Sequence, residues 1–414
     1  MADQSNDFRA ALYIGAVILI VLFLAAVLIL PALRSVDAKI VYDTDAEKAL
    51  EYGRAGEHRK AIEIYERLSE TISREQFPYE YACIQNGLGA NYGVLSEGPD
   101  REQNMERAAG HFSQALTVFT KDKYPEEFAA NQKSRGVTLQ ALGEIRNNST
   151  EFAEAVTAFS AASEIYTESA DPVEYAKTQA GLGYCYGRLA FDRDPEENAR
   201  RSREAFGNAL RITTIEKYPY AYAQIQSYRG EVTSPPESIT AYNEALRIFT
   251  AAEYPEEYAD NQAQLGNIYQ SLGNEETGNV NITLAEQAYL NTLTVWNAEK
   301  YPEEYTNAQA ALGGVYLERV LEEDRNVYMP KAEHALREAL KGVDKERHPQ
   351  KYGSVLFNLA ILYASADDIR TNETNRRYAD QAFTEAARYI TPEKFPEEYQ
   401  KLEKNRRQFQ ELVQ

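Results

Sequence analysis

The sequence predicts an all-α protein in which an N-terminal transmembrane helix is followed by a long solenoid of helix pairs. Three observations support this prediction: an uncharged apolar run over residues 10–33, a proline that returns at a fixed interval, and an aromatic residue three positions after each of these prolines. A fixed interval along most of a chain is typical of repeat arrays. The chain has 414 residues, which is more than one compact core usually accommodates.

The first predicted element is a membrane helix over residues 10–33, a run of 24 residues without a charge between Arg9 and Arg34. At about 1.5 Å per residue such a helix is about 36 Å long, which exceeds a hydrocarbon core of about 30 Å. A cleaved signal peptide is the alternative, but its apolar core is usually shorter. We therefore expect a tail over residues 1–9, an uncleaved single-pass anchor, and a linker over residues 34–44.

The charges beside the apolar run give little basis for orienting the anchor. Arg9 stands before it, whereas Arg34 and Lys39 stand after it, so the count of positive charges is nearly level. A short N-terminal tail commonly stays in the cytoplasm while a large following domain is exported. We therefore expect the solenoid to lie on the extracytoplasmic side.

A repeat occupies residues 45–395, and we expect about eight units there, followed by a more polar capping helix over residues 396–414. Every interval between the repeated prolines is 47 residues, except that from the fourth to the fifth, which is 36. Proline and the acidic residues after it suit the first turn of a helix, where no N–H is needed and the helix dipole is positive. The prolines are Pro78, Pro125, Pro172, Pro219, Pro255, Pro302, Pro349 and Pro396.

Each unit is predicted to hold two helices that pack through paired ladders of small and large residues. In the first helix a glycine such as Gly89 recurs eleven positions after the proline, at helical spacing from the other small and apolar positions. Because glycine weakens a helix by about 1 kcal/mol, its recurrence implies the close approach of another helix. The second helix repeats a small residue with a large one four positions later. The large residues are Tyr65, Phe112, Phe159, Phe206, Tyr242, Tyr289, Leu336 and Phe383.

These ladders resemble the tetratricopeptide repeat (TPR). Its pattern is matched by Leu88, Gly89 and Tyr92 in one helix, by Ala108 and Phe112 in the next, and then by Pro125. The usual period of about 34 residues is exceeded, because longer loops rich in Asn, Asp, Glu and Gly separate the two helices. The resemblance implies a right-handed superhelix of helix pairs, whose first helices line a concave side that binds peptides or protein segments.

The candidate binding face is a stripe of the first helices, at positions five, eight and twelve after each proline. These positions lie between the packing positions and carry small residues, amides and scattered lysines. The stripe lacks the dense basic pattern of TPR proteins that clamp a terminal carboxylate, and an ordinary solvated face is the alternative. The contact candidates are Asn86, Lys133, Lys177, Tyr184, Asn267 and Asn307.

Four asparagines begin N-x-Ser/Thr sequons, and all four lie in the expected loops between helices. They are candidate glycosylation sites if the solenoid is extracytoplasmic. Chance is the alternative, because loops rich in Asn, Ser and Thr produce such triplets readily. The four residues are Asn147, Asn148, Asn281 and Asn372.

Composition and motifs argue against several functions. The chain has 44 basic and 64 acidic residues, a net charge of −20, which disfavours nucleic acid and anionic lipid as partners. Its two cysteines, Cys83 and Cys185, fall in non-adjacent units, so we expect packed thiols rather than a disulfide. None of the four histidines has metal-ligand spacing, and no phosphate loop or nucleophile motif occurs. We expect no catalytic residues, metal, cofactor or small-molecule substrate.

The leading hypothesis is a membrane-anchored scaffold for protein–protein interaction, which binds other proteins or itself. One alternative is a self-assembling structural protein of a cell surface or envelope. Another is an accessory subunit of a membrane enzyme complex, whose anchor would pack through small residues such as Gly15 and Ala16. The sequence identifies neither the partner nor the oligomeric state.

Overall fold

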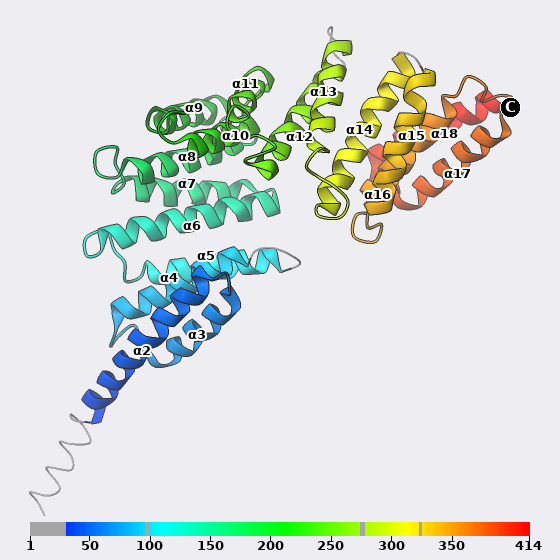
Figure 1. The fold of residues 1–414 in the computed structure, drawn as a ribbon. Helices are drawn as coiled ribbons and strands as arrows, with labels where there is room; N and C mark the ends of the chain where they lie inside the picture. The colour runs from blue at the N-terminus through cyan, green and yellow to red at the C-terminus, as the bar shows by residue number, and fades with distance from the viewer. Residues whose placement is uncertain (1–29, 96–99, 274–277, 323–324) are drawn as a thin grey trace, which may run out of the picture. The chain divides into compact units, whose positions relative to one another are not determined.

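The computed structural model describes residues 30–95, 100–273, 278–322 and 325–414. Within these ranges the chain forms 17 helices and no strand, and 77% of the residues are helical. Consecutive helices pack as pairs (Figure 1), which confirms the prediction of an all-α chain of repeated helix pairs. The chain divides into two compact units, which meet in sequence at Thr213 and Thr214.

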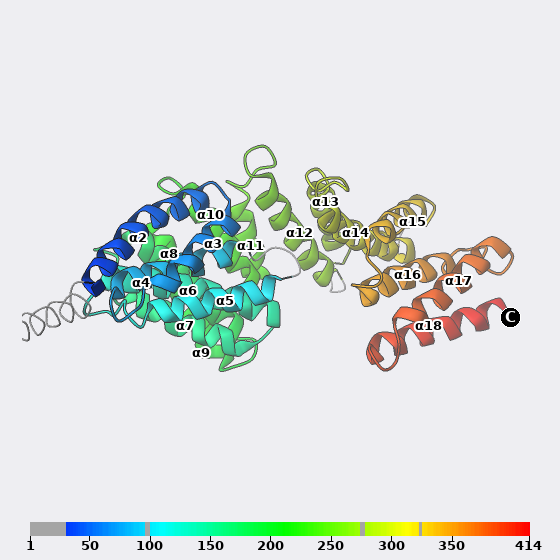
Figure 2. The ribbon, with the colours of Figure 1, turned by 90° about the horizontal axis from the view of Figure 1, so that it is seen from below.

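The first unit contains the helices from α2 to α9, and the second contains those from α10 to α18; their succession can also be followed in Figure 2. The first unit comprises α2 (Leu30–Arg54), α3 (His58–Thr71), α4 (Pro78–Val94), α5 (Arg101–Ala115), α6 (Pro125–Arg146), α7 (Ser149–Ser163), α8 (Pro172–Leu189) and α9 (Pro195–Ile212). The second comprises α10 (Pro219–Val232), α11 (Pro235–Ala245), α12 (Pro255–Leu272), α13 (Gly278–Thr292), α14 (Pro302–Glu322), α15 (Arg325–Gly342), α16 (Pro349–Ala364), α17 (Glu373–Tyr389) and α18 (Pro396–Val413).

All eight repeated prolines begin a helix, as the spacing predicts; we call these eight helices the first helices, and the helix that follows each of the first seven a second helix. The residue before the proline is not helical, with φ of −141° and ψ of 67° at Tyr124 and nearly the same angles at Tyr254, because proline disfavours the helical region for its predecessor. The carbonyl of that residue still accepts the first helical hydrogen bond, as from Phe128 N to Tyr124 O at 2.8 Å. The proline therefore fixes where each unit starts.

The glycines of the first helices lie directly against the large residues of the second helices. A Cβ added to Gly136 would lie 2.9 Å from the ring of Phe159, and one added to Gly181 of the next first helix would lie 2.6 Å from the same ring. Phe159 is 1% exposed and is therefore enclosed between two glycines. A methyl group at either position would overlap the ring, so the predicted close approach of helices is confirmed and explains the glycine ladder.

Asparagines close several of the loops between first and second helices. The side-chain amide of Asn104 donates to Leu95 O at 2.6 Å, and that of Asn281 donates to Leu272 O at 3.2 Å, in each case from the start of a second helix to the end of the preceding first helix. Asn104 and Asn281 both stand 21 positions before the next repeated proline. The prediction that Asn281 lies in a loop is wrong, because α13 begins at Gly278.

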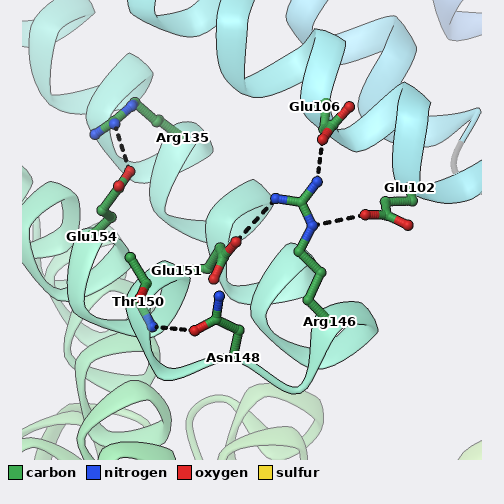
Figure 3. A network of polar contacts seen from close by, with 8 residues as sticks. All are labelled: Glu102, Glu106, Arg135, Arg146, Asn148, Thr150, Glu151 and Glu154. Atoms are coloured by element: carbon green, nitrogen blue, oxygen red, sulfur yellow. Dashed lines mark hydrogen bonds and ion pairs between the residues drawn. The ribbon is translucent and has the colours of Figure 1, made fainter.

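An arginine at the end of a first helix joins neighbouring pairs in each unit. In the first unit Arg146 ends α6 and reaches Glu102 of α5 at 2.8 Å, Glu106 of α5, and Glu151 of α7 at 3.0 Å (Figure 3). Charge-assisted contacts of a guanidinium with several carboxylates hold three helices in one register. In the second unit the buried Arg319 of α14 likewise lies 3.1 Å from a carboxylate oxygen of Glu286 on α13.

The N-terminal segment differs in part from the expected organisation. Residues 10–29 of the predicted membrane span lie outside the described residues, and α2 begins inside that span, at Leu30. None of the helices in the described ranges is both long and apolar enough to cross a membrane. Residues 34–44, expected as a linker, are helical and belong to α2, which packs on the first unit through Ala49 and an ion pair from Lys39 to Glu80.

The short interval between Pro219 and Pro255 gives the shortest helix pair of the described chain, with 14 residues in α10 and 11 in α11. Only Thr233 and Ser234 connect the two helices. The sequence indicates a deletion in the loop and at the end of the first helix. The second helix is shortened as well, since α11 begins 20 positions before the next proline whereas α5 begins 24 before it.

Candidate protein-binding surface

Successive first helices within each unit contact one another along one side, which we call the first-helix face. Short polar bridges join them: Asn131 Nδ2 donates to Asn86 Oδ1 at 2.9 Å between α6 and α4, and Ser227 Oγ donates to Asn261 Oδ1 at 2.8 Å between α10 and α12. Asn131 and Asn261 are buried and Ser227 is partly buried, so these bridges fix the spacing of the helices. The face is therefore built by packing contacts between units as well as within them.

The six predicted contact residues fall into two groups. Asn86, Lys177, Asn267 and Asn307 are exposed, and Lys133 is half-buried. Tyr184 is only 3% exposed and packs against the ring of Phe152, with 6.4 Å between ring centroids, so it adds no accessible surface. The stripe is thus an exposed face at most of the predicted positions, and a packing position at Tyr184.

Most of the exposed candidates are already engaged by neighbouring helices. Asn86 accepts the hydrogen bond from α6 described above, and the side chain of Asn307 on α14 accepts one from Lys351 on α16. Lys133 of α6 forms an ion pair with Glu174 of α8, whose other oxygen lies 2.7 Å from Lys177. The candidates are spread over five first helices and do not converge on one site.

A groove opens on the first-helix face between α10 and α12, in the second unit. Its volume is about 310 Å³. On the α10 side it is lined by residues that recur one helical turn apart, and the α12 side supplies a second, shorter row. The buried Tyr242 and Phe249 form its back. The lining residues are Tyr220, Gln224, Ser227, Tyr228, Glu231, Tyr242, Phe249, Glu257, Asp260, Asn261 and Gln264.

An aromatic cluster holds one end of this groove. The ring of Tyr220 lies 5.5 Å from that of Phe249 and 5.3 Å from that of Tyr254, and Phe249 and Tyr254 meet edge to face at 5.6 Å. Such tilted arrangements are the favourable ones for aromatic rings. The Tyr220 hydroxyl donates to Glu257 Oε1 at 3.0 Å. The tyrosine is therefore fixed in orientation, although 41% of its surface is exposed.

The floor of the groove on the α12 side is acidic. Asp260 is exposed, but the groove walls remove part of the water around its carboxylate, and Glu304, Glu257 and Glu256 add negative charge. Together these effects raise the pKa of Asp260 to about 6. Residues 248–318 contain eleven acidic residues and one basic residue, Lys300, which lies 3.7 Å from Glu256. No described cation pairs with Asp260, so its charge is available to a ligand.

The groove is lined in part by positions of the predicted stripe, but the contact candidates include no residue of α10. Gln224, Ser227 and Glu231 stand five, eight and twelve positions after Pro219, and Asp260 stands five after Pro255, all on the predicted stripe. None of them was among the six contact candidates. Two signals point to this junction: the shortened interval after Pro219, and a tyrosine directly after the proline, which occurs elsewhere in the repeat series only at Tyr79.

The sequons and cysteines lie away from this groove. Asn147 ends α6 in the left-handed conformation, with φ of 48°, and Asn148 caps α7 by accepting from Thr150 N at 3.0 Å. Asn372 caps α17 in the same manner, by accepting from the backbone N of the third residue after it at 3.1 Å. Sequon asparagines therefore also serve as helix caps. Cys83 and Cys185 are unpaired, and burial raises the pKa of the Cys185 thiol.

Comparison of the chain with models of protein families and with curated proteins found no match.

Proposed function

We propose that this protein is a membrane-anchored scaffold whose TPR-like solenoid binds segments of other proteins. The observation that carries the proposal is the first-helix face: a repeated face within each unit, fixed by proline starts, glycine–aromatic contacts and polar bridges. A rigid repeated face of this kind suits the recognition of an extended partner. The function assigned is binding rather than catalysis.

The TPR resemblance is part of the proposal. The contacts of Gly136 and Gly181 with Phe159 agree with the role that the small and large positions have in that repeat. We propose a right-handed superhelix whose first helices line the concave side. Direct contact between successive first helices, as between α4 and α6 or α14 and α16, supports this placement, because helices on an inner side lie closest together.

The membrane anchor is proposed from residues 10–33. If these residues span a bilayer, α2 would carry the anchor into the first unit as a continuous helix, because it starts at Leu30 and remains helical to Arg54. Its contacts with the rest of the unit, such as Arg67 with Asp45 at 2.9 Å, would then restrict how the solenoid is presented at the membrane surface. We propose an extracytoplasmic solenoid on the ground of the short N-terminal tail.

The test is site-specific cross-linking in native membranes. A photoreactive residue is placed at Asn267, exposed on the first helix α12, and in a matched variant at Gln287, exposed on the second helix α13 of the same pair. We expect the protein to stay with membranes after alkaline extraction, and a discrete cross-linked partner at Asn267 but not at Gln287. A chain that yields no adduct at either position and purifies as a monomer would contradict the scaffold.

The same experiment distinguishes a second candidate function, self-assembly. Helix α13 exposes three large apolar side chains, with Val280 63%, Leu284 40% and Leu290 39% accessible. Exposed apolar side chains on one helix can contribute to an association surface. Adducts that contain only a second copy of this chain, formed from Gln287, would favour self-assembly over the binding of another protein.

A further inference from the structure

We propose that the groove between α10 and α12 binds a short extended segment of a partner protein that carries lysine or arginine side chains. This proposal rests on the scaffold function proposed above and assigns to it one site and one class of ligand. Three properties of the groove support the assignment: its dimensions, its fixed aromatic side chains, and the negative charge of Asp260, with which no described cation pairs.

The groove has room for a short extended peptide. Its α10 side runs from Tyr220 to Glu231, and eleven residues of helix at about 1.5 Å each span about 16 Å. Extended chain advances about 3.3 Å per residue, so about five residues fit along this length. The exposed amides of Gln224 and Gln264 stand on opposite sides and can both donate to and accept from a peptide backbone.

The aromatic side chains favour a cation. Tyr220 and Tyr228 line the groove, and Tyr220 is held by Phe249, Tyr254 and its hydrogen bond to Glu257. A cationic side chain over the face of a tyrosine is attracted by the ring, by about 0.5–1 kcal/mol at exposed sites and more when water is removed. Because Tyr220 is already fixed, little conformational freedom is lost when a ligand binds.

The carboxylates select for positive charge. Asp260 lies in the groove with Glu231 and Glu257 along the same walls, and Glu304 and Glu256 add to the field at Asp260. Repulsion among these groups is relieved when a cation enters, whereas an acidic segment would be opposed by all of them. Arginine or lysine on the ligand would form a charge-assisted contact with Asp260 in a site partly shielded from water.

The proposal is tested with full-length protein in a non-ionic detergent and a fluorescent octapeptide of alternating glycine and lysine, measured by anisotropy; the control peptide alternates glycine and glutamate. We expect Asp260→Lys to weaken binding of the lysine peptide by at least about tenfold and Asp260→Asn by about fivefold. Glu393→Lys makes the same change in net charge at an exposed position outside the groove, and we expect it to leave binding within about twofold.

Circular dichroism of each variant establishes that the helices are retained, and Asp260→Asn, which keeps the size of the side chain, separates loss of charge from misfolding. Equal effects of Asp260→Lys and Glu393→Lys, or equal binding of both peptides, would overturn the groove assignment. If either result is obtained while position 267 still cross-links a partner, the scaffold function is retained and only the assignment of the groove is rejected. Loss of both would overturn the two proposals together.

Discussion

The junction between α4 and α6 and the junction between α10 and α12 share a set of packing contacts, which we call the shared frame, and differ in the residues at the stripe positions. Each has a tyrosine after the repeated proline, and each tyrosine joins a cluster of three rings: Tyr79 lies 5.7 Å from Phe119, and Tyr220 lies 5.5 Å from Phe249. In both, the tyrosine hydroxyl donates to a glutamate two positions after the next proline, at 3.1 Å and 3.0 Å. The tyrosine, its neighbouring rings and its glutamate acceptor therefore adopt the same arrangement at both junctions.

The difference lies at the stripe positions above this frame. Where α10 carries Glu231 and α12 carries Asp260, the corresponding residues of α4 and α6 are Ala90 and Ala130. The α4–α6 junction also has Tyr42 of α2 against Cys83, at the position that Gln224 occupies in the groove. The comparison indicates that packing positions keep the two junctions alike, while the residues at the stripe give them different charge and access.

The largest expected effect tests the shared frame. Phe119 and Phe249 are 2% and 1% exposed, and each packs on two buried alanines that occupy equivalent repeat positions. We expect Phe119→Ala and Phe249→Ala each to lower the free energy of unfolding by about 3–5 kcal/mol, because each leaves a cavity in a closed cluster. Denaturant unfolding of the full chain, followed by circular dichroism, measures the loss.

Limited proteolysis then assigns each loss to a unit: Phe119→Ala is expected to expose cleavage sites in residues 30–213, and Phe249→Ala in residues 214–414. Phe191→Ala is a matched control, since this ring is 73% exposed and its removal leaves no cavity. A large loss at one junction and none at the other would show that the two frames are not equivalent.

A smaller effect, on peptide affinity, is expected when the acidic residues of the α10–α12 junction are transferred to the α4–α6 junction. Ala90→Glu with Ala130→Asp places two carboxylates at the stripe positions of α4–α6 that correspond to Glu231 and Asp260. In a chain whose own groove is disabled by Asp260→Lys, we expect this pair to raise affinity for the glycine–lysine peptide by about threefold, the size typical of partly exposed charge pairs. Anisotropy with the same peptide measures the gain.

The matched control adds two acids to a second helix, by Gln287→Glu with Asn291→Asp, and is expected to leave affinity unchanged. Equal gains from both pairs of substitutions would mean that net charge alone attracts the peptide. If the α4–α6 pair gives no gain although the unsubstituted protein binds the peptide through its α10–α12 groove, Tyr42 and α2 close the first junction to ligands.

The sequence predicts the packing features that every unit repeats, but it does not predict features that occur in one unit alone. Proline starts, the glycine ladder and its contact with residues such as Phe159 follow from spacing, because each unit must satisfy the same packing. Exposure at the stripe does not follow, since it depends on neighbours distant in sequence: Tyr184 is covered by Phe152, 32 residues away. The groove itself depends on how a shortened pair meets the next one; the short interval after Pro219 and Tyr220 mark this junction in the sequence but do not specify that contact.

The smallest expected effect concerns pH and the charge that distinguishes the α10–α12 junction. The pKa of Asp260 is raised to about 6 in the folded chain, by loss of water and by the carboxylates of Glu304, Glu257 and Glu256, against about 3.9 for an unfolded aspartate. The folded state therefore binds the proton more tightly than the unfolded state. Protonation of this group stabilises the second unit as pH falls from 7 towards 5, and the ionised group opposes folding at neutral pH.

We expect Asp260→Asn to raise the unfolding midpoint of the second unit slightly at pH 7 and to leave it unchanged at pH 4, where the native carboxyl is already neutral. The effect is small because Asp260 is exposed and salt screens its charge. Denaturant midpoints at both pH values, compared with those of Ala130→Asn at the corresponding position of α6, measure it. An equal shift of the midpoint at both pH values would mean that the ionised Asp260 does not destabilise the fold. The acidic floor would then not distinguish the two junctions.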